Sequence, residues 1–232
     1  MAEKTGLSRR DLKSPDEFLS TFGRVIAWCK ENRTKTIAGA GAVVVVLALV
    51  LGTQAYLQWE ENRSSRELWP TLDRAQQLLQ APKAADPSQL AAVERFLEGH
   101  VNAHPGTRAT VYSLYYLGDI AFHRGEYDLA IKRFREAIAT GKEAGVMKYL
   151  LREAIATSLE AKGDFPAAAA AYRDAAAVAG TNEKADSRMG EARVLGLSGK
   201  KAEAAAVYRL ILQETPETPL RELVEIRLAQ SE

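Results

Sequence analysis

The sequence is poor in the residues on which several kinds of function depend. It has one cysteine, three histidines and 7% aromatic residues among 232, and its 31 lysines and arginines nearly balance 30 aspartates and glutamates. A single cysteine, Cys29, excludes an internal disulfide and a metal site made of cysteines alone. The net charge of +1 argues against a nucleic-acid binder, which would need a surplus of lysine and arginine to contact phosphates.

The scarcity of aromatic residues also bears on the fold class. The second half of the chain is rich in alanine, the residue with the highest helix propensity, whereas strands favour aromatic and β-branched residues. We therefore predict an all-α protein. A chain of this length supplies enough apolar material for one or two domains.

Charge is absent from one long segment near the amino end, residues 36–57. A helix of this length measures about 33 Å, which matches the hydrocarbon thickness of a bilayer. The sequence therefore predicts a transmembrane helix, with Tyr56 and Trp59 at one interface and Arg33 and Lys35 at the other. The alternative is a buried helix of a soluble core, but such helices are shorter and usually keep a polar stripe.

The distribution of basic residues predicts the orientation of this span. Eight lysines and arginines precede it, whereas the 20 residues after it hold three. The positive-inside rule makes residues 1–35 a cytoplasmic tail. A cleaved signal peptide is the rival interpretation, although the apolar segment is too long and its leader too long and too acidic for one.

The predicted tail contains an amphipathic helix at about residues 15–31. Ser14, Pro15 and Glu17 form a typical helix start, and apolar residues then recur at helical spacing: Phe18, Leu19, Phe22, Val25 and Ile26. Such a helix can lie on the inner leaflet or dock on a protein partner, and the sequence leaves both open.

Beyond Trp59 the chain repeats itself. Gly125, Gly163 and Gly199 follow one another at spacings of 38 and 36 residues, and each ends one helical pattern and begins another. Each glycine has a small residue seven positions before it, an alanine five after it and an aromatic nine after it. These are Gly118, Ala156 and Ala192; Ala130, Ala168 and Ala204; and Phe134, Tyr172 and Tyr208.

This spacing predicts helical hairpins. A glycine accepts the left-handed conformation that ends the first helix, small residues let the two backbones approach, and the aromatic ring fills the gap towards the next hairpin. One hairpin cannot bury its apolar face alone, so the units must stack into an α-solenoid. We predict about four hairpins in a domain spanning 58–232, at about residues 66–104, 111–144, 149–182 and 185–218.

The two ends of the predicted stack are less regular. In the first hairpin, Asp86 begins a helix in which Ala92 and Phe96 take the alanine and aromatic positions, and Pro70 kinks or starts the partner helix. A capping helix over 219–230 closes the other end with its apolar residues, Leu220, Leu223, Ile226 and Leu228.

Residues 112–138 carry the pattern that resembles the tetratricopeptide family. They place Leu117, Gly118, Gly125, Tyr127, Ala130, Phe134 and Ala137 where the family motif has them. Two departures are the absence of the usual tryptophan near the start of all three strong units and Ala121 in place of a common tyrosine.

The layout as a whole is similar to a narrower family, the YfgM-like ancillary subunits of the bacterial Sec translocon, and residues 16–63 are its most specific stretch. The resemblance implies a single-pass protein of the bacterial inner membrane with its repeat domain in the periplasm. It also implies partners: translocon membrane subunits, a membrane-anchored periplasmic chaperone of the prolyl-isomerase class, and unfolded or secreted polypeptides.

The resemblance further implies a partner-binding groove lined by the first helix of each hairpin. It places ten residues there: Tyr112, Tyr115, Asp119, Phe122, His123, Leu150, Glu153, Thr157, Met189 and Arg193. The alternative is that the aromatic members pack against the preceding hairpin or the last helix. The set lacks the lysine and asparagine with which some relatives bind the terminal carboxylate of a peptide.

Nothing in the sequence predicts an enzyme, a cofactor or a metal. His100 and His104 are four residues apart, but the glutamate of a zinc protease is missing between them, and we expect a surface or capping role. Two functions remain: an adaptor at the translocon, or a structural coordinator of envelope complexes for wall synthesis or division.

Overall fold

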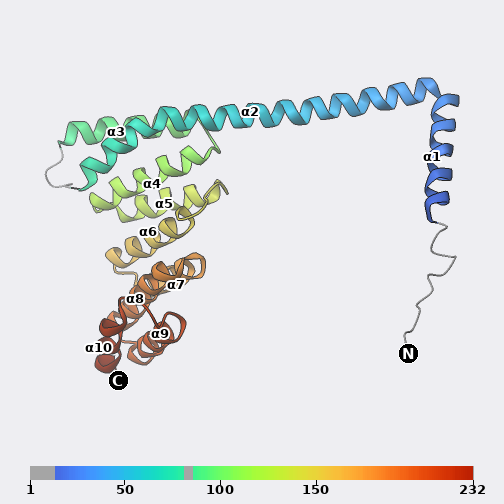
Figure 1. Ribbon diagram of the computed structural model, residues 1–232. Helices are drawn as coiled ribbons and strands as arrows, with labels where there is room; N and C mark the ends of the chain where they lie inside the picture. The colour runs from blue at the N-terminus through green and yellow to red at the C-terminus, as the bar shows by residue number, and fades with distance from the viewer. Residues whose placement is uncertain (1–13, 81–85, 232) are drawn as a thin grey trace, which may run out of the picture. The chain divides into compact units, whose positions relative to one another are not determined.

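The computed structural model describes residues 14–80 and 86–231, apart from the side chains of 14–22 and 182. All regular structure in this part of the chain is helical, which confirms the predicted fold class (Figure 1). The helices are α1 (Ser14–Glu31), α2 (Arg33–Gln80), α3 (Pro87–Ala103), α4 (Arg108–His123), α5 (Tyr127–Ala139), α6 (Met147–Lys162), α7 (Phe165–Val178), α8 (Thr181–Leu197), α9 (Lys201–Glu214) and α10 (Arg221–Ser231). The chain forms two compact units that divide within α2, between Gln58 and Trp59.

The first unit contains α1 and the apolar part of α2. Among the described residues, α2 is the one helix long and apolar enough to cross a membrane, with a mean hydropathy of 2.3 over its most apolar window and no burial of that window. In α1, Val25 and Ile26 are exposed. The predicted cap at Ser14 and the predicted apolar side chains Phe18, Leu19 and Phe22 lie outside the described side chains.

The second unit begins with the remainder of α2, where one of the two alternatives predicted for Pro70, a helix start, was wrong. Pro70 starts no new helix, because α2 continues through it to Gln80. The reason is that Pro70 is exposed, whereas the opposite side of the helix is buried through Leu68, Leu72, Ala75 and Leu78. Burying each leucine stabilises this segment by about 1.5–3 kcal/mol, which together offsets the roughly 3 kcal/mol cost of an interior proline.

The next six helices form the three predicted hairpins, α4 with α5, α6 with α7 and α8 with α9. Gly125, Gly163 and Gly199 all adopt positive φ, at 78°, 85° and 79°, and lie just after the first helix of each hairpin, as predicted. Glycine is needed at these turns because a side chain would be strained in that conformation. The alanines five residues later, Ala130, Ala168 and Ala204, are all buried.

Two aromatic rings lie directly on glycine backbone. A Cβ added at Gly118 would stand 2.4 Å from Cε1 of Phe134, and one added at Gly190 would stand 2.6 Å from Cε1 of Tyr172. The Tyr172 ring therefore fills the gap towards the next hairpin, as predicted. The Phe134 ring packs on Gly118 of its own hairpin and belongs to the same buried cluster as Met147 and Leu151 of α6.

The register predicted for α3 was also wrong. Ala92 is exposed and Phe96 is 40% exposed, whereas Val93 and Leu97 are buried. The reason is that the packed face of α3 joins the apolar side of α2 in a second core cluster, and this contact sets its rotation. The predicted cap is confirmed, because the Asp86 carboxylate accepts a hydrogen bond from the Ser88 amide at 2.8 Å.

The last helix differs from the prediction in its start and its buried face. It begins at Arg221 rather than at residue 219, and Val224 is its fully buried residue. Leu223 and Ile226 remain 42% and 48% exposed, so they do not close the stack as predicted. Leu220 and Leu228 pack on the core as expected.

The hairpins stack unevenly. The first helices contact one another, α4 with α6 and α6 with α8, whereas within the described chain the second helices α5, α7 and α9 make no comparable contacts with one another. Elements that are closer on one side of a stack curve it towards that side. We call the exposed surface of α4, α6 and α8 the inner face.

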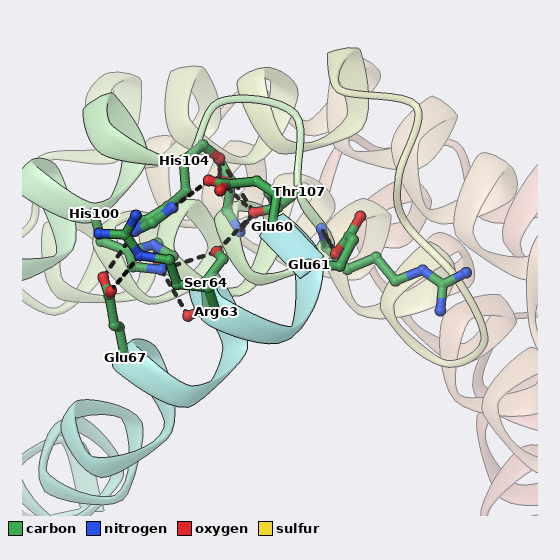
Figure 2. Close-up of polar contacts among 11 residues, drawn as sticks. Glu60, Glu61, Arg63, Ser64, Glu67, His100, His104 and Thr107 are labelled. Carbon is green, nitrogen blue, oxygen red and sulfur yellow. Dashed lines mark hydrogen bonds and ion pairs between the residues drawn. The ribbon is translucent and has the colours of Figure 1, made fainter. Parts of the chain in front are cut away.

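A buried polar network joins α2 to the loop between α3 and α4 (Figure 2). For His100 we predicted a surface or capping role, but it lies within α3 and is 4% exposed, so the surface alternative was wrong. Its Nε2 donates to the Ser64 carbonyl oxygen at 3.0 Å, and its Nδ1 lies 2.9 Å from the Ser113 hydroxyl. Burial lowers the pKa of His100, which favours the neutral ring.

His104, for which a surface or capping role was also predicted, is 3% exposed and occupies the C-cap of α3, so the capping alternative is confirmed. Its preferred charge is opposite to that of His100. Its Nδ1 lies 2.6 Å from a Glu60 carboxylate oxygen and its Nε2 lies 2.8 Å from one of Glu67. Carboxylates only accept, so both nitrogens donate and the ring is an imidazolium. Burial alone would lower the pKa of His104, but the two carboxylates outweigh it and raise the pKa.

The contact between Gly118 and Phe134 can be tested with one methyl group. We expect Gly118→Ala to lower the free energy of unfolding by about 1–3 kcal/mol, because the buried ring has to shift. Gly99→Ala in α3 is the matched control, since nothing lies within 4 Å of its added Cβ. Helix propensity alone should make that control about 1 kcal/mol more stable. Denaturant unfolding of the detergent-solubilised protein measures the free energy of unfolding of both variants. Equal changes in Gly118→Ala and Gly99→Ala would contradict the packing of Phe134 on Gly118.

The histidine network predicts a dependence of stability on pH. The raised pKa of His104 means that its contribution is complete below its ordinary value of 6.5 and disappears as pH rises through the folded value. The lowered pKa of His100 means that stability also falls as pH drops below 6.5. We expect His104→Gln to cost about 1–3 kcal/mol near pH 6 and to flatten the alkaline limb.

Thermal unfolding between pH 5 and pH 9 measures this profile. Ala170→Gln on α7 is the control, because Ala170 is exposed and the substitution changes no titratable group, so both limbs should keep their wild-type form. If the stability of His104→Gln still falls at alkaline pH as in the wild type, the His104 imidazolium does not stabilise the contact between α2 and the repeats.

Candidate protein-binding surface

The ten predicted groove residues all lie on the first helices of the hairpins. Five are on α4, three on α6 and two on α8. The structure divides them into an aromatic group at α4 and a polar group between α6 and α8.

The aromatic group packs largely within the fold. Tyr112 lies 6.0 Å from Trp69 of α2 between ring centroids, and Tyr115 lies 5.8 Å from Phe134. Phe122 contacts Tyr127 at 5.6 Å. Together with Leu150 and Met189, these rings are partly buried against the main core cluster. Tyr112 therefore packs against the preceding hairpin, as the alternative predicted, whereas Tyr115 and Phe122 pack against α5 of their own hairpin. Only the remaining exposed edges of these rings can contact a partner.

Burial also determines the charge states at α4. It raises the pKa of Tyr115 to about 12, so this phenol stays neutral at physiological pH. Burial likewise raises the pKa of the Asp119 carboxyl, against the opposing effect of His123, whose Nε2 lies 3.5 Å away. His123 is the most exposed member of the α4 group and lies at the end of the helix.

The polar group is built around Arg193 of α8. Its guanidinium forms an ion pair with Glu160 of α6 and donates to the Tyr172 hydroxyl at 3.4 Å. The Tyr172 hydroxyl in turn donates to Glu160 at 2.7 Å and lies 3.4 Å from the Thr157 hydroxyl. Since 54% of the Arg193 side chain is exposed, it bridges two hairpins and still presents a cation on the inner face.

A second polar contact lies beside the first. The Ser187 hydroxyl donates to Glu153 at 2.6 Å, and burial raises the pKa of this carboxyl. Burial also raises the pKa of the neighbouring Tyr149 to about 12. The contacts Glu153–Ser187 and Glu160–Arg193 connect α6 to α8, so the predicted residues Glu153, Thr157 and Arg193 do come together.

Sequence reasoning missed Tyr149 and Glu160 on this face, and also the buried Ser187 that bonds Glu153. A signal was present, because Tyr149, Glu153, Thr157 and Glu160 recur every three or four residues and therefore share one side of α6. The pairing of Glu160 with Arg193 had no such signal, since it depends on the distance between two hairpins.

The inner face offers hydrogen-bonding groups and charges of both signs rather than reactive chemistry. Across residues 14–80 and 86–231, no group of three His, Cys, Asp or Glu side chains is arranged to hold a metal ion. A polar surface with exposed aromatic edges can bind polypeptide by hydrogen bonds, ion pairs and apolar contact.

Comparison with known proteins agrees with this architecture. The chain is similar to the crystal structure of YrrB, described as a TPR protein with an unusual peptide-binding site, with a TM-score of 0.51 and 14% sequence identity. The similarity covers 75% of this chain and 81% of that one, and at this identity it shows the fold alone. No protein of curated function matches in sequence.

The sequence matches the tetratricopeptide repeat family over residues 90–144 and 153–219, just over half of the chain. The match spans α4 to α9, whose glycine turns and buried alanines are described above, and includes much of α3. The chain belongs to the tetratricopeptide repeat family.

Proposed function

We propose that this protein is a membrane-anchored adaptor that binds other proteins through the inner face of its repeats. Repeats of this family form protein-interaction scaffolds, and the conclusion that the chain is an adaptor rests on them. The membrane anchor is a separate part of the proposal and rests on evidence of its own.

One observation carries the anchor: the exposure of the apolar part of α2. Ile37, Leu49 and Leu51 are 72%, 65% and 64% exposed, and the most apolar window of this helix has no burial at all. A helix of a soluble core would bury these side chains, and a continuous apolar surface of this length is unfavourable in water. A bilayer is the environment that such a helix fits.

The orientation and the partners rest on the sequence. The excess of basic residues before the span favours a cytoplasmic amino end, which leaves the repeats on the opposite side. The resemblance to YfgM-like subunits favours the bacterial inner membrane, a periplasmic repeat domain, and association with translocon subunits and a chaperone of the prolyl-isomerase class. Binding of unfolded or secreted polypeptides would be the task of the inner face.

Extraction from membranes tests the anchor. We expect the protein to stay in the membrane pellet after alkaline carbonate washing. Val45→Arg combined with Leu49→Arg should release it, because each arginine at the centre of a span costs about 2.5–3.5 kcal/mol. Val45→Leu with Leu49→Val is the control and should remain in the pellet.

Protease added to spheroplasts tests the orientation in the same preparation. External protease should digest the repeats while residues 1–35 stay protected. A wild-type protein that carbonate extracts, repeats that resist the protease, or a mature chain shortened by cleavage near residue 55 would each contradict the proposal.

Photo-crosslinking from defined positions tests the partners. A photoreactive residue at Leu49 should crosslink to translocon helices, and one at Arg193 should crosslink to a chaperone or an exported polypeptide. Ala170, exposed on the second helix α7, is the control position and should give at least tenfold less product. Crosslinks to wall-synthesis or division proteins instead would support the scaffold alternative and exclude the translocon role.

A further inference from the structure

A hollow at the carboxyl-terminal end of the repeat domain begins at Met189 and Arg193 of the inner face and extends beyond them. It lies between α8, α9 and α10 and has a volume of about 520 Å³. Ligand pockets commonly measure about 300–1,000 Å³, so the size suits a bound group. Met189, Ala192, Leu197, Ala204, Tyr208 and Leu223 supply its apolar lining.

Two of these residues are exposed although they are large and apolar. Leu197 is 59% exposed and Leu223 is 42% exposed. Leu223 was expected to close the stack, but Val224 takes that role and is fully buried. Val224 already packs α10 onto the core, so Leu223 is not needed for that packing and its exposed side chain can contact a partner.

The charges around the hollow are mostly positive. Arg193, Lys201 and Arg227 line it, and Asp186 is the one acidic residue among the described residues of the lining. The charge of Arg193 is offset by Glu160. Arg227 donates to the neutral Gln230 at 3.3 Å, and within the described chain neither it nor Lys201 has an ion-pair partner.

The position of Lys201 strengthens this point. It is the first residue of α9, where the helix dipole disfavours a cation and favours an anion. The helix therefore gains nothing from this charge, whereas a carboxylate placed near it would be stabilised both by the lysine and by the helix terminus.

Gly196 lines the hollow, and neither its backbone conformation nor its neighbours require a glycine at this position. It lies within α8, it does not have positive φ, and nothing stands within 4 Å of an added Cβ. Glycine inside a helix costs about 1 kcal/mol relative to alanine. Its effect here is to keep the hollow open to a group that approaches the helix backbone.

We propose that this hollow binds an internal segment of a partner polypeptide, with a bulky apolar side chain between Leu197 and Leu223 and a neighbouring carboxylate at Lys201 and Arg227. The apolar lining and the unpaired cations are complementary to that combination. The inference rests on the proposed protein-binding function and extends the inner face to a contact site at the end of the stack.

The test uses the full chain in detergent micelles and a fluorescent ten-residue peptide with both ends blocked. The peptide carries one central phenylalanine flanked by glutamates, and a second peptide has lysines in their place. We expect fluorescence anisotropy to show at least tenfold tighter binding of the acidic peptide. Equal binding of the two peptides, or no binding of the acidic one, would overturn the proposal.

Gly196→Leu locates the site, because the new side chain fills the hollow while removing a glycine from a helix. It should weaken binding of the acidic peptide at least tenfold. Gly99→Leu, at an exposed position of α3, should leave this binding unchanged. Thermal unfolding establishes that both variants are folded. Unchanged binding by Gly196→Leu would overturn the assignment.

A charge reversal gives a readout that does not depend on loss of binding. Lys201→Glu with Arg227→Glu should reverse the preference, so that the lysine peptide binds more tightly than the acidic one. An unreversed preference would show that these cations do not contact the ligand. Crosslinking from His123, which lies on α4 outside the lining of the hollow, separates the two proposals in Gly196→Leu. Persistent crosslinks beside unaffected peptide binding reject the hollow alone, whereas no crosslinks in the wild type reject the adaptor function.

Discussion

The repeat domain depends on the close approach of neighbouring helices at residues that have little or no side chain. The rings of Phe134 and Tyr172 lie on the backbone of Gly118 and Gly190, where a single methyl group would collide with them. Interiors packed at this density tolerate small changes of volume poorly. The distance between helices is therefore fixed at these contacts, and with it the stacking of one hairpin on the next.

That fixed stacking gives the inner face its properties. Because α4, α6 and α8 approach one another, side chains from different hairpins meet, as Glu160 and Arg193 do across α6 and α8. At the other end of the domain, His104 links the loop before α4 to Glu60 and Glu67 of α2. The first repeat is thus joined by a charged contact to the same helix that carries the apolar segment.

The sequence predicted what depends on local chemistry. Gly125, Gly163 and Gly199 were identifiable because a left-handed turn needs glycine, and Ala130, Ala168 and Ala204 because they recur at fixed distances from those turns. Rotation of irregular helices was not predictable, since Val93 rather than Ala92, and Val224 rather than Leu223, face the core through contacts with distant elements. The same limit applies to the site, where packing of Tyr112 against the preceding hairpin was one predicted alternative, but packing of Tyr115 against Phe134 in its own hairpin was not predicted.

The central claim is that the inner face of an anchored repeat stack binds polypeptide. Hydrogen–deuterium exchange of the full chain in lipid nanodiscs, with and without a permanently unfolded polypeptide, tests it most directly. The account predicts slower exchange in α4, α6 and α8 on binding, little change in α5 and α7, and protection of residues 36–57 in both states. Slowing confined to α5 and α7, or rapid exchange of residues 36–57 in the bilayer, would contradict it.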